Sequence, residues 1–449
     1  MSSKSILVAL AGLTLVGAAL AAPVETSLRP KARPGMAAPP VTTGIATRNI
    51  VFRSLRPLAR PAGLATMPVA RAAVLDPGLA SWIRRFRGRA LAQGIRPGVF
   101  EAAFRNARYD TEAIDRDRNQ AEFKSAIWDY LDNAASPPRV EDGQRMLRRY
   151  RRALDRIERS YGVDREVVIA IWGLESRYGT RMGDHSMIDA LATLAHDGRR
   201  GRFFENQLVA ALKILQSGDV SVSDFKGSWA GAMGHTQFIP TSYLAYAVDF
   251  TGDGKRDIWS DDPTDALAST ARYLSRFGWN KDQPWGVEVR LPRGFDASQA
   301  SRSIRRMPSR WARAGVTDMN GQPVPDHGRA SILLPAGRDG AAFMIFDNFA
   351  VLERYNNADA YVIGVGYLAD RIKGGPPIQA SWPRGYQPLS FAEKKELQRR
   401  LRDTGHGVEK IDGLIGPNTT TAIRGFQQSV GMQADGFPSK AVLARLRGG

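Results

Sequence analysis

Glu175 is the residue whose surroundings point most directly to chemistry, because it ends an apolar segment with helical spacing. A helix from Val163 to Tyr178 would place apolar residues 168, 171 and 172 on the same side as this carboxyl group. Apolar neighbours and the negative end of a helix both favour the protonated form. Glu175 is therefore a candidate general acid, for example for cleavage of a glycosidic bond. A solvated or salt-bridged surface glutamate is the alternative.

A second group of oxygen-bearing residues follows at 249–257 and resembles the start of a calcium-binding loop. Oxygen ligands would alternate at Asp249, Thr251, Asp253 and the backbone carbonyl of Lys255. The twelfth position is Ser260 rather than a glutamate, so a standard EF-hand is excluded. An Asp- and Gly-rich turn held by its own side-chain hydrogen bonds is the alternative to a structural calcium site. The sequence predicts no required cofactor.

Several other chemistries lack the residues that they need. The chain has no cysteine, which excludes disulfides, thiolate ligands and a cysteine nucleophile. Its five histidines lack the paired spacing of a zinc protease, and there is no Gly-x-Ser-x-Gly or phosphate-binding Gly-Lys-Ser/Thr motif. Metallopeptidase, serine hydrolase and nucleotide-dependent activities are therefore not expected.

The amino terminus has the features of a signal peptide at residues 1–22. Lys4 precedes an apolar run at 6–20, and small residues at 19–21 offer a cleavage site. No second long apolar stretch follows, and no cysteine can carry a lipid, so we expect a soluble periplasmic protein without an integral membrane segment after cleavage. The formal charge of +18 suits an anionic wall polymer or lipid surface, or reflects scattered solvated arginines. Export argues against nucleic acid as the partner.

The 449 residues divide into several regions by composition. Residues 23–75 are rich in Ala, Pro and Arg and predict a disordered linker. Apolar spacing near 3.6 begins after residue 76 and predicts a mostly helical domain over 76–375. Residues 376–388 resemble a second linker, and 389–448 predict a small domain of three short helices.

The text around Glu175, Ala170-Ile171-Trp172-Gly173-Leu174-Glu175-Ser176-Arg177-Tyr178-Gly179, resembles the Glu-Ser motif of lytic murein transglycosylases. The similarity is to the membrane-bound lytic transglycosylase B family, and it continues through 189–195, 199–207 and 227–243. The resemblance implies a mostly α, goose-type lysozyme-like catalytic domain. It also implies that Glu175 is the single catalytic carboxylate.

The same resemblance implies a set of substrate-contacting residues. Ser228 would hold the carboxyl group of the acid, and Gln237 would contact substrate. Aromatic contacts to sugar rings or acyl groups would come from Tyr130, Tyr273 and Tyr361. Tyr355-Asn356 resembles the segment that closes the active site, with Asn356 orienting the N-acetyl group; Ala358 stands where the family usually has serine. Some relatives close a calcium loop with an aspartate that matches Asp265, although two extra residues precede it here.

The resemblance also implies a reaction and a polymer substrate. A lytic transglycosylase cleaves the β-1,4 bond between N-acetylmuramic acid and N-acetylglucosamine and leaves a 1,6-anhydromuramic end. Two alternatives remain open: a hydrolytic muramidase, with Asp184 or Asp189 as a second carboxylate, and a non-catalytic scaffold that binds the wall. Residues 397–446 resemble the peptidoglycan-binding domain of wall hydrolases through Asp412-Gly413, Gly416-Pro417, Phe426-Gln427 and Asp435-Gly436. Peptidoglycan glycan strands are the expected partner.

Overall fold

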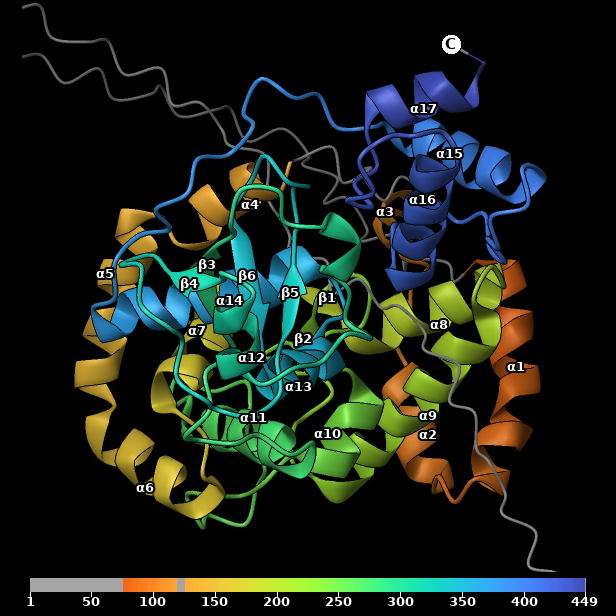
Figure 1. Ribbon diagram of the computed structural model, residues 1–449. Coiled ribbons are helices and arrows are strands. Elements are labelled where there is room, and N and C mark those ends of the chain that lie inside the picture. The colour runs from red at the N-terminus through yellow and green to blue at the C-terminus, as the bar shows by residue number, and fades with distance from the viewer. Residues whose placement is uncertain (1–75, 119–125, 449) are drawn as a thin grey trace, which may run out of the picture. The chain divides into compact units, whose positions relative to one another are not determined.

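The computed structural model describes residues 76–118 and 126–448, which fall within one compact unit (Figure 1). The predicted signal peptide at 1–22 and the predicted linker at 23–75 lie outside the described residues. None of the helices in the described ranges combines the length and apolar character that a membrane crossing requires.

Helices form most of residues 77–373, which confirms the predicted fold class. The helices before the first glycine-rich segment are α1 (Pro77–Ala92), α2 (Pro97–Phe104), α3 (Thr111–Arg118), α4 (Ile127–Ala134), α5 (Pro137–Arg149), α6 (Arg151–Tyr161) and α7 (Arg165–Ser176). Those that follow are α8 (Met187–Asp197), α9 (Gly201–Ser217), α10 (Pro240–Tyr246), α11 (Thr264–Arg276), α12 (Pro308–Arg313), α13 (Asp347–Tyr355) and α14 (Asp359–Lys373). A two-stranded ribbon pairs β1 (His185–Ser186) with β2 (Lys226–Gly227).

The helix α7 lies at the centre of this region, packed against α5, α6, α11 and α14. Its residues 167–173 are all buried, because the segment is apolar on every side except its two ends. The helix ends at Ser176, and the following Arg177 and Tyr178 both have positive φ angles, of 51° and 57°. The chain therefore turns sharply just after Glu175.

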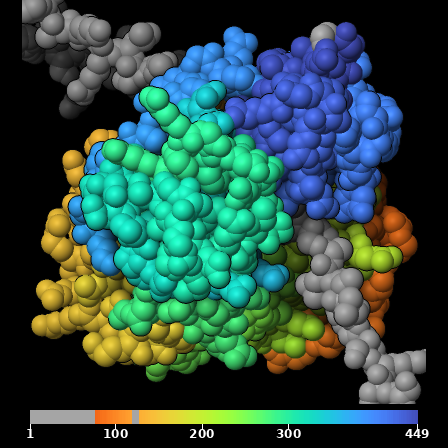
Figure 2. Space-filling model, viewed as in Figure 1, coloured from red at the N-terminus to blue at the C-terminus, as the bar shows by residue number. Residues whose placement is uncertain are grey.

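Residues 286–345 add a small antiparallel sheet that the sequence did not predict. Its strands are β3 (Gly286–Arg290), β4 (Thr317–Asp318), β5 (Ser331–Leu333) and β6 (Ala342–Ile345), in the order β4-β3-β6-β5. Val287 pairs with Met344, and Ile332 pairs with Met344 from the other side. A separate apolar core around Trp311 supports the sheet, and this region forms the blue-green surface near the middle of Figure 2.

The carboxy-terminal module has the three predicted helices, α15 (Phe391–Asp403), α16 (Pro417–Ser429) and α17 (Lys440–Leu446), around their own apolar core. A glutamine on each of the first two helices holds an Asp-Gly turn. The carbonyl oxygen of Gln398 accepts from the amide of Gly413 at 2.7 Å, and that of Gln427 accepts from Gly436 at 2.8 Å. The two Asp-Gly sequences therefore form turns that are anchored to the helices of this module.

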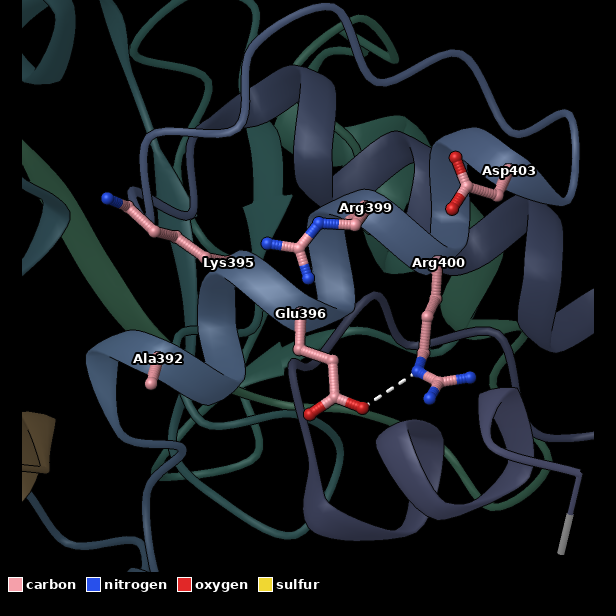
Figure 3. Close-up of a pocket in the computed structure, with 6 residues that line it drawn as sticks. All are labelled: Ala392, Lys395, Glu396, Arg399, Arg400 and Asp403. Atoms are coloured by element: carbon pink, nitrogen blue, oxygen red, sulfur yellow. Dashed lines mark hydrogen bonds and ion pairs between the residues drawn. The ribbon is translucent and has the colours of Figure 1, made fainter.

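A shallow hollow lies along the outer side of α15 (Figure 3). Lys395 and Arg399 border it, and Glu396 accepts a hydrogen bond from Arg400 at 2.8 Å. Charged side chains form most of the lining of this hollow, and the hollow is open to solvent. It does not include any residue predicted to touch substrate.

Residues 376–388 contain no helix or strand, yet they are packed rather than free. The Trp382 ring lies 6.3 Å from that of Trp128 on α4, and Arg384 forms an ion pair with Asp132 at 2.7 Å. Two backbone amides, of Gln379 and Ala380, donate to the carboxylate of Glu288 on β3. This segment therefore runs along the surface of the helical region.

Candidate active site

Glu175 lies in the last turn of α7, where its carboxyl group meets the hydroxyl group of Tyr361 on α14. The Tyr361 hydroxyl donates to Oε1 of Glu175 at 2.6 Å. Val168, Ile171 and Trp172 on the same side of α7 are buried, as the helical spacing predicts. The α7–α14 contact therefore brings together two residues that are 186 positions apart in the chain.

Burial dominates the electrostatics of this carboxyl group. It raises the pKa of Glu175 to about 7, and the hydrogen bond from Tyr361 opposes part of the increase by stabilising the ionised form. Among residues 76–118 and 126–448, no second carboxyl group contributes to the pKa of Glu175. The group is thus suited to donate a proton near neutral pH and to accept it again.

The two acids that a hydrolase would recruit are engaged elsewhere. Asp189 accepts a hydrogen bond from the backbone amide of Arg108 at 3.0 Å, and the negative charge of Asp184 acts on His185. His185 is itself paired with Asp110 at 2.7 Å. Among the residues that the structure describes, Glu175 is thus one candidate acid without an opposed carboxylate.

Four predicted aromatic residues gather around Glu175. The Tyr355 and Tyr361 rings are nearly parallel, with centroids 6.5 Å apart and an interplanar angle of 6°, and Tyr273 meets the Tyr355 ring at 5.1 Å. The charge of Glu175 also acts on Tyr130, whose hydroxyl is buried with no hydrogen-bond partner in the described chain. A buried hydroxyl group of this kind is usually satisfied by a hydrogen bond, so it is available to a polar group of a bound ligand.

Asn356 follows Tyr355 at the end of α13 and is almost fully buried. Its side-chain oxygen accepts from the amide of Ala358 at 3.1 Å, so the backbone at 358 helps to orient it despite the missing serine hydroxyl. The Tyr355 hydroxyl donates to the carbonyl of Thr236 at 2.6 Å. This bond joins the α13 end to the Gly-rich segment before α10.

The predicted residues of that Gly-rich segment have backbone partners in the structure. The Ser228 hydroxyl accepts from the amide of Ala232 at 3.0 Å, whereas Tyr361 is the hydrogen-bond partner that acts on Glu175 in the described residues; the role of Ser228 in holding the acid stays a prediction. Gln237 has a φ of 55°, and its side-chain amide donates to the carbonyls of Met182 at 3.0 Å and Gly234 at 2.8 Å. Both side chains brace the loop in this structure.

His235 is a site-supporting residue that the sequence analysis did not assign. Its Nδ1 accepts from the Trp172 indole at 3.1 Å, and its Nε2 donates to the carbonyl of Ser260 at 2.7 Å. Burial lowers the pKa of His235, in keeping with a neutral ring in this tautomer. The only local signal was its place inside the Gly234-to-Gln237 text, next to a predicted substrate residue.

Arg302 was also missed, and it braces the other wall of the site. Its guanidinium pairs with Glu353 on α13 and with Asp359 on α14, on either side of Tyr355 and Asn356. It also lies over the Phe349 ring, 5.1 Å from the centroid. Nothing in the sequence near residue 302 indicated this contact across more than 50 positions.

The loop predicted to hold calcium gathers three carboxylates. Oxygen atoms of Asp249, Asp253 and Asp265 lie within 4.8 Å of one another. Asp249 accepts from the amides of Gly252 at 2.6 Å and Gly254 at 2.8 Å, and these bonds lower its pKa. Burial raises the pKa of Asp265, which accepts from the amides of Phe250 and Thr251, each at 2.9 Å.

The other two predicted ligands also belong to this loop. The Thr251 hydroxyl lies 3.3 Å from the Asp249 carboxylate, and the Lys255 amide donates to Asp253 at 2.9 Å. The donors are all hard oxygens, which suits calcium. The hydrogen bonds within the loop equally match the alternative of a self-supporting turn.

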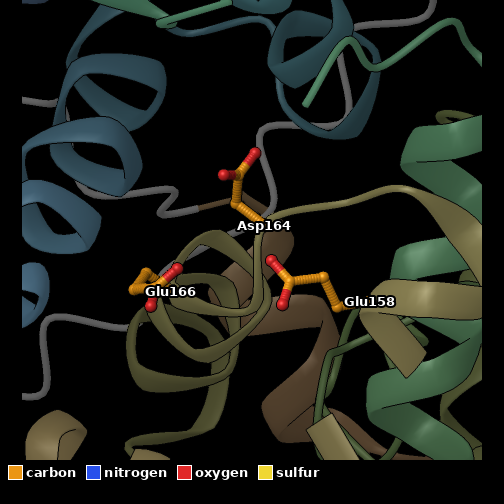
Figure 4. Close-up of side chains that lie close together, drawn as sticks. All are labelled: Glu158, Asp164 and Glu166. Carbon is orange, nitrogen blue, oxygen red and sulfur yellow. The ribbon is translucent and has the colours of Figure 1, made fainter. Parts of the chain in front are cut away.

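A second acidic cluster lies where α6 leads into α7 (Figure 4). Each acid has its own protein partner: Asp164 accepts from the Trp279 indole at 2.9 Å, Glu166 pairs with Arg165 at 3.2 Å and Glu158 pairs with Lys281 at 3.4 Å. Each carboxylate of this cluster therefore has a structural role, because it contacts a side chain of the protein.

Comparison with known proteins places this helical site in a family. Residues 78–370 match the Transglycosylase SLT domain family, and residues 392–446 match the peptidoglycan binding domain family. The first match covers more than half of the chain. The chain therefore belongs to the lytic transglycosylase family.

Particular relatives agree with this assignment. The chain is 35% identical over 250 residues to membrane-bound lytic murein transglycosylase B of Escherichia coli, a match that covers 54% of this chain and 66% of that protein. Its structure resembles that of SltB3 from Pseudomonas aeruginosa in complex with NAG-anhNAM-pentapeptide, with 50% identity, a TM-score of 0.80, and coverage of 83% of this chain and all of that one. It also resembles E. coli Slt35 in complex with calcium, with 31% identity, a TM-score of 0.55, and coverage of 66% and 93%.

Proposed function

We propose that this protein cleaves peptidoglycan glycan strands as a lytic transglycosylase and leaves 1,6-anhydromuramic ends. The observation that carries the proposal is a single partly buried acid: Glu175 has a pKa of about 7, a tyrosine donor and, within residues 76–118 and 126–448, no second carboxylate acting on it. The family assignment and the likeness to a relative bound to NAG-anhNAM-pentapeptide support the same substrate class.

The chemistry uses the same carboxyl group twice. Glu175 donates its proton to the glycosidic oxygen, so the bond to the anomeric carbon of the muramic residue breaks with a neutral leaving group. The substrate's own N-acetyl group assists at the anomeric carbon. The ionised Glu175 then takes the proton from the 6-hydroxyl, whose oxygen closes on the anomeric carbon. No water is consumed, and Glu175 returns to its protonated form.

Digestion of purified sacculi tests this reaction directly. We expect muropeptides with anhydro ends, identified by mass, from the native chain and none from Glu175→Gln. Release of reducing ends that contain an added water would identify a muramidase instead. Binding to sacculi without release of any fragment would identify a non-catalytic scaffold.

We propose further that the carboxy-terminal module binds the polymer and that the protein works in the periplasm after signal-peptide cleavage. The family match at 392–446 supports the first statement, and the apolar run at 6–20 supports the second. Attachment through a second site would raise the concentration of strands around the catalytic region. Cleavage after residue 22, measured by the mass of the mature chain, tests the export prediction.

We also propose that the 249–265 loop binds calcium as a structural ion. Three carboxylates within 4.8 Å and the calcium complex of a relative support this assignment. Asp249, Asp253 and Asp265 would hold the ion, with Thr251 and the carbonyl of Lys255 completing the predicted ligands. The ion would neutralise their mutual repulsion and take no part in the reaction.

A further inference from the structure

Three arginines near the end of α7 have no acidic partner in the described chain. They are Arg177 and Arg181, in the turn that follows the helix, and Arg139, in the first turn of α5. Arg139 is partly buried; its guanidinium donates only to the carbonyl of Asn133, and its Nε is buried without a hydrogen bond. We call these three residues the unpaired arginine cluster.

The cluster differs from arginines elsewhere in the described chain that have acidic partners. Arg199 and Arg200 share the carboxylate of Asp117, and Arg302 joins Glu353 and Asp359. Burial lowers the pKa of Arg139, and the positive charges of Arg177 and Arg181 lower it further. The positive end of α5 adds to this charge, because its first turn contains no acidic residue.

Two neighbouring acids are paired with arginines outside the cluster. Asp142, whose charge reaches Tyr178, pairs with Arg145, and Asp132 on α4 pairs with Arg384. Gathering Arg177 and Arg181 near Arg139, which lies at the amino terminus of α5, costs free energy unless an anion offsets the charge. The arrangement therefore suits an anion that comes from outside the described chain.

The cluster is attached to the catalytic residue by short structural links. Arg177 is two positions after Glu175, and the amide of Arg181 donates to the carbonyl of Ser176 at 2.9 Å. The Tyr178 hydroxyl donates to the carbonyl of Arg139 at 2.8 Å, which fixes the start of α5 beside this turn. Burial raises the pKa of Tyr130, the charge of Glu175 raises it further and that of Arg139 lowers it, so Tyr130 is close enough to feel both charges.

We propose that the unpaired arginine cluster binds a carboxylate on the peptide stem of the muramic residue that is cleaved. This inference rests on the proposed function. The sugar backbone is uncharged, whereas the peptide attached to muramic acid carries carboxylates. Guanidinium groups bind carboxylates through paired, charge-assisted hydrogen bonds. The cluster would therefore favour strands that carry charged peptides.

Two matched substrates test the inference: glycan strands with native peptide carboxylates, and the same strands after conversion of those groups to amides. We expect the full-length native chain to show a KM ~10-fold lower on the charged strands, with a similar kcat. Arg181→Gln should reduce this preference ~3-fold, and Arg177→Gln with Arg181→Gln should nearly abolish it. Both arginines are exposed, so thermal unfolding should be little changed.

Arg159→Gln is the matched control, because Arg159 is an exposed arginine on α6 without an ion-pair partner in the described chain. It should keep the full preference. Equal KM values for the native chain on the two substrates would overturn the inference. An equal loss of preference in Arg159→Gln would also overturn it, because that loss would indicate a general effect of net charge. So would a double variant, Arg177→Gln with Arg181→Gln, that no longer binds anionic phospholipid vesicles but keeps the substrate preference.

Co-sedimentation separates this inference from the proposed reaction. Glu175→Gln should bind the charged strands more tightly than the amidated strands, and adding Arg181→Gln should reduce the difference. If the native chain releases no anhydro ends but this preference persists, the proposed reaction is wrong and the carboxylate site stands. If anhydro ends form and binding shows no preference, the carboxylate site is wrong and the reaction stands.

Discussion

Glu175 and Asp249 show how one functional group acquires opposite properties in two regions of the protein. Glu175 lies between packed helices, where burial raises its pKa to about 7. Asp249 lies on an exposed loop, where backbone amides from residues 252, 253 and 254 surround its carboxylate and lower its pKa. The first environment keeps a proton available, whereas the second keeps a negative charge.

The difference follows from what the surrounding chain offers to each acid. The end of α7 supplies apolar side chains, and within the described residues Glu175 has one hydrogen-bond donor, Tyr361 on α14, so the charged form of Glu175 gains little. The turn at 249–254 supplies several N–H donors to one carboxylate, so the charged form of Asp249 gains much. A proton-transfer site and a charge-holding site can therefore coexist within one fold.

The largest expected effect comes from replacing the carboxyl group that transfers the proton. Glu175→Gln should lower the release of anhydro ends by ~10²–10⁴-fold, because an amide cannot act as a general acid. Glu166→Gln on the same helix is the control, since Glu166 pairs with Arg165 away from the site. Retention of most activity in Glu175→Gln would remove Glu175 from the reaction.

The two acids should affect stability with opposite signs as the pH changes. The folded-state pKa of Glu175 lies above its ordinary value of 4.5, so ionisation costs stability as the pH rises through this interval to about 7. Glu175→Gln should thus stabilise the protein by ~2–3 kcal/mol near pH 8 and by little near pH 4.

Asp249→Asn should do the reverse. The folded-state pKa of Asp249 is lowered, so its charge stabilises the fold at neutral pH, and this contribution disappears as the pH falls through that lowered value. The variant should melt below the native temperature at neutral pH, with a smaller difference in acid. Denaturation at several pH values measures both effects; a shift of the same sign in the two variants would contradict the comparison.

Calcium should sharpen the contrast, because the three carboxylates of the charge-holding loop can bind it, whereas the single carboxyl group of Glu175 offers no such group of ligands. At a concentration 100-fold above its dissociation constant, the ion should stabilise the fold by about 2.7 kcal/mol, and a chelator should reverse this. Asp253→Asn should weaken the response. Glu158→Gln, in the acidic cluster at the α6–α7 junction, should keep it. If calcium does not change the free energy of unfolding of the native chain, the alternative of a self-supporting turn is supported instead.

The smallest expected effect comes from the single donor to Glu175. Tyr361→Phe removes the hydrogen bond that lowers the pKa of the acid, so the alkaline limb of kcat/KM should move upward by ~0.5–1 pH unit. Tyr367→Phe, on the same helix and half-exposed, should leave the limb in place. A limb that moves downward in Tyr361→Phe would show that Tyr361 stabilises the neutral acid.

Local pattern was enough to identify α7, Glu175 and the three helices of the carboxy-terminal module. It placed the end of α7 too late, at Tyr178, because long-range packing decides that point. A Cβ atom on Gly173 would lie 2.5 Å from the Tyr178 ring, and the Tyr178 hydroxyl reaches α5. Tyr178 therefore folds back onto its own helix, a contact that depends on a residue 39 positions away.

The sheet and the bracing residues were not predictable in the same way. The strands contain two to five residues, too few to show a clear alternation, and β3 pairs with a strand more than 50 positions later. His235 and Arg302 act through partners on other elements, so their neighbours in sequence carry no sign of the role. The roles of the tyrosines and Asn356 remain predictions that the geometry supports.

The hydrogen bond between Tyr361 and Glu175 spans 186 positions, which has a consequence for the timing of activity. A nascent or partly folded chain can form α7 early, since helices depend on local contacts. It cannot enclose the acid until α14 has been made and docked. An enzyme that cuts peptidoglycan would therefore remain inactive throughout synthesis and would become active only once folding is complete.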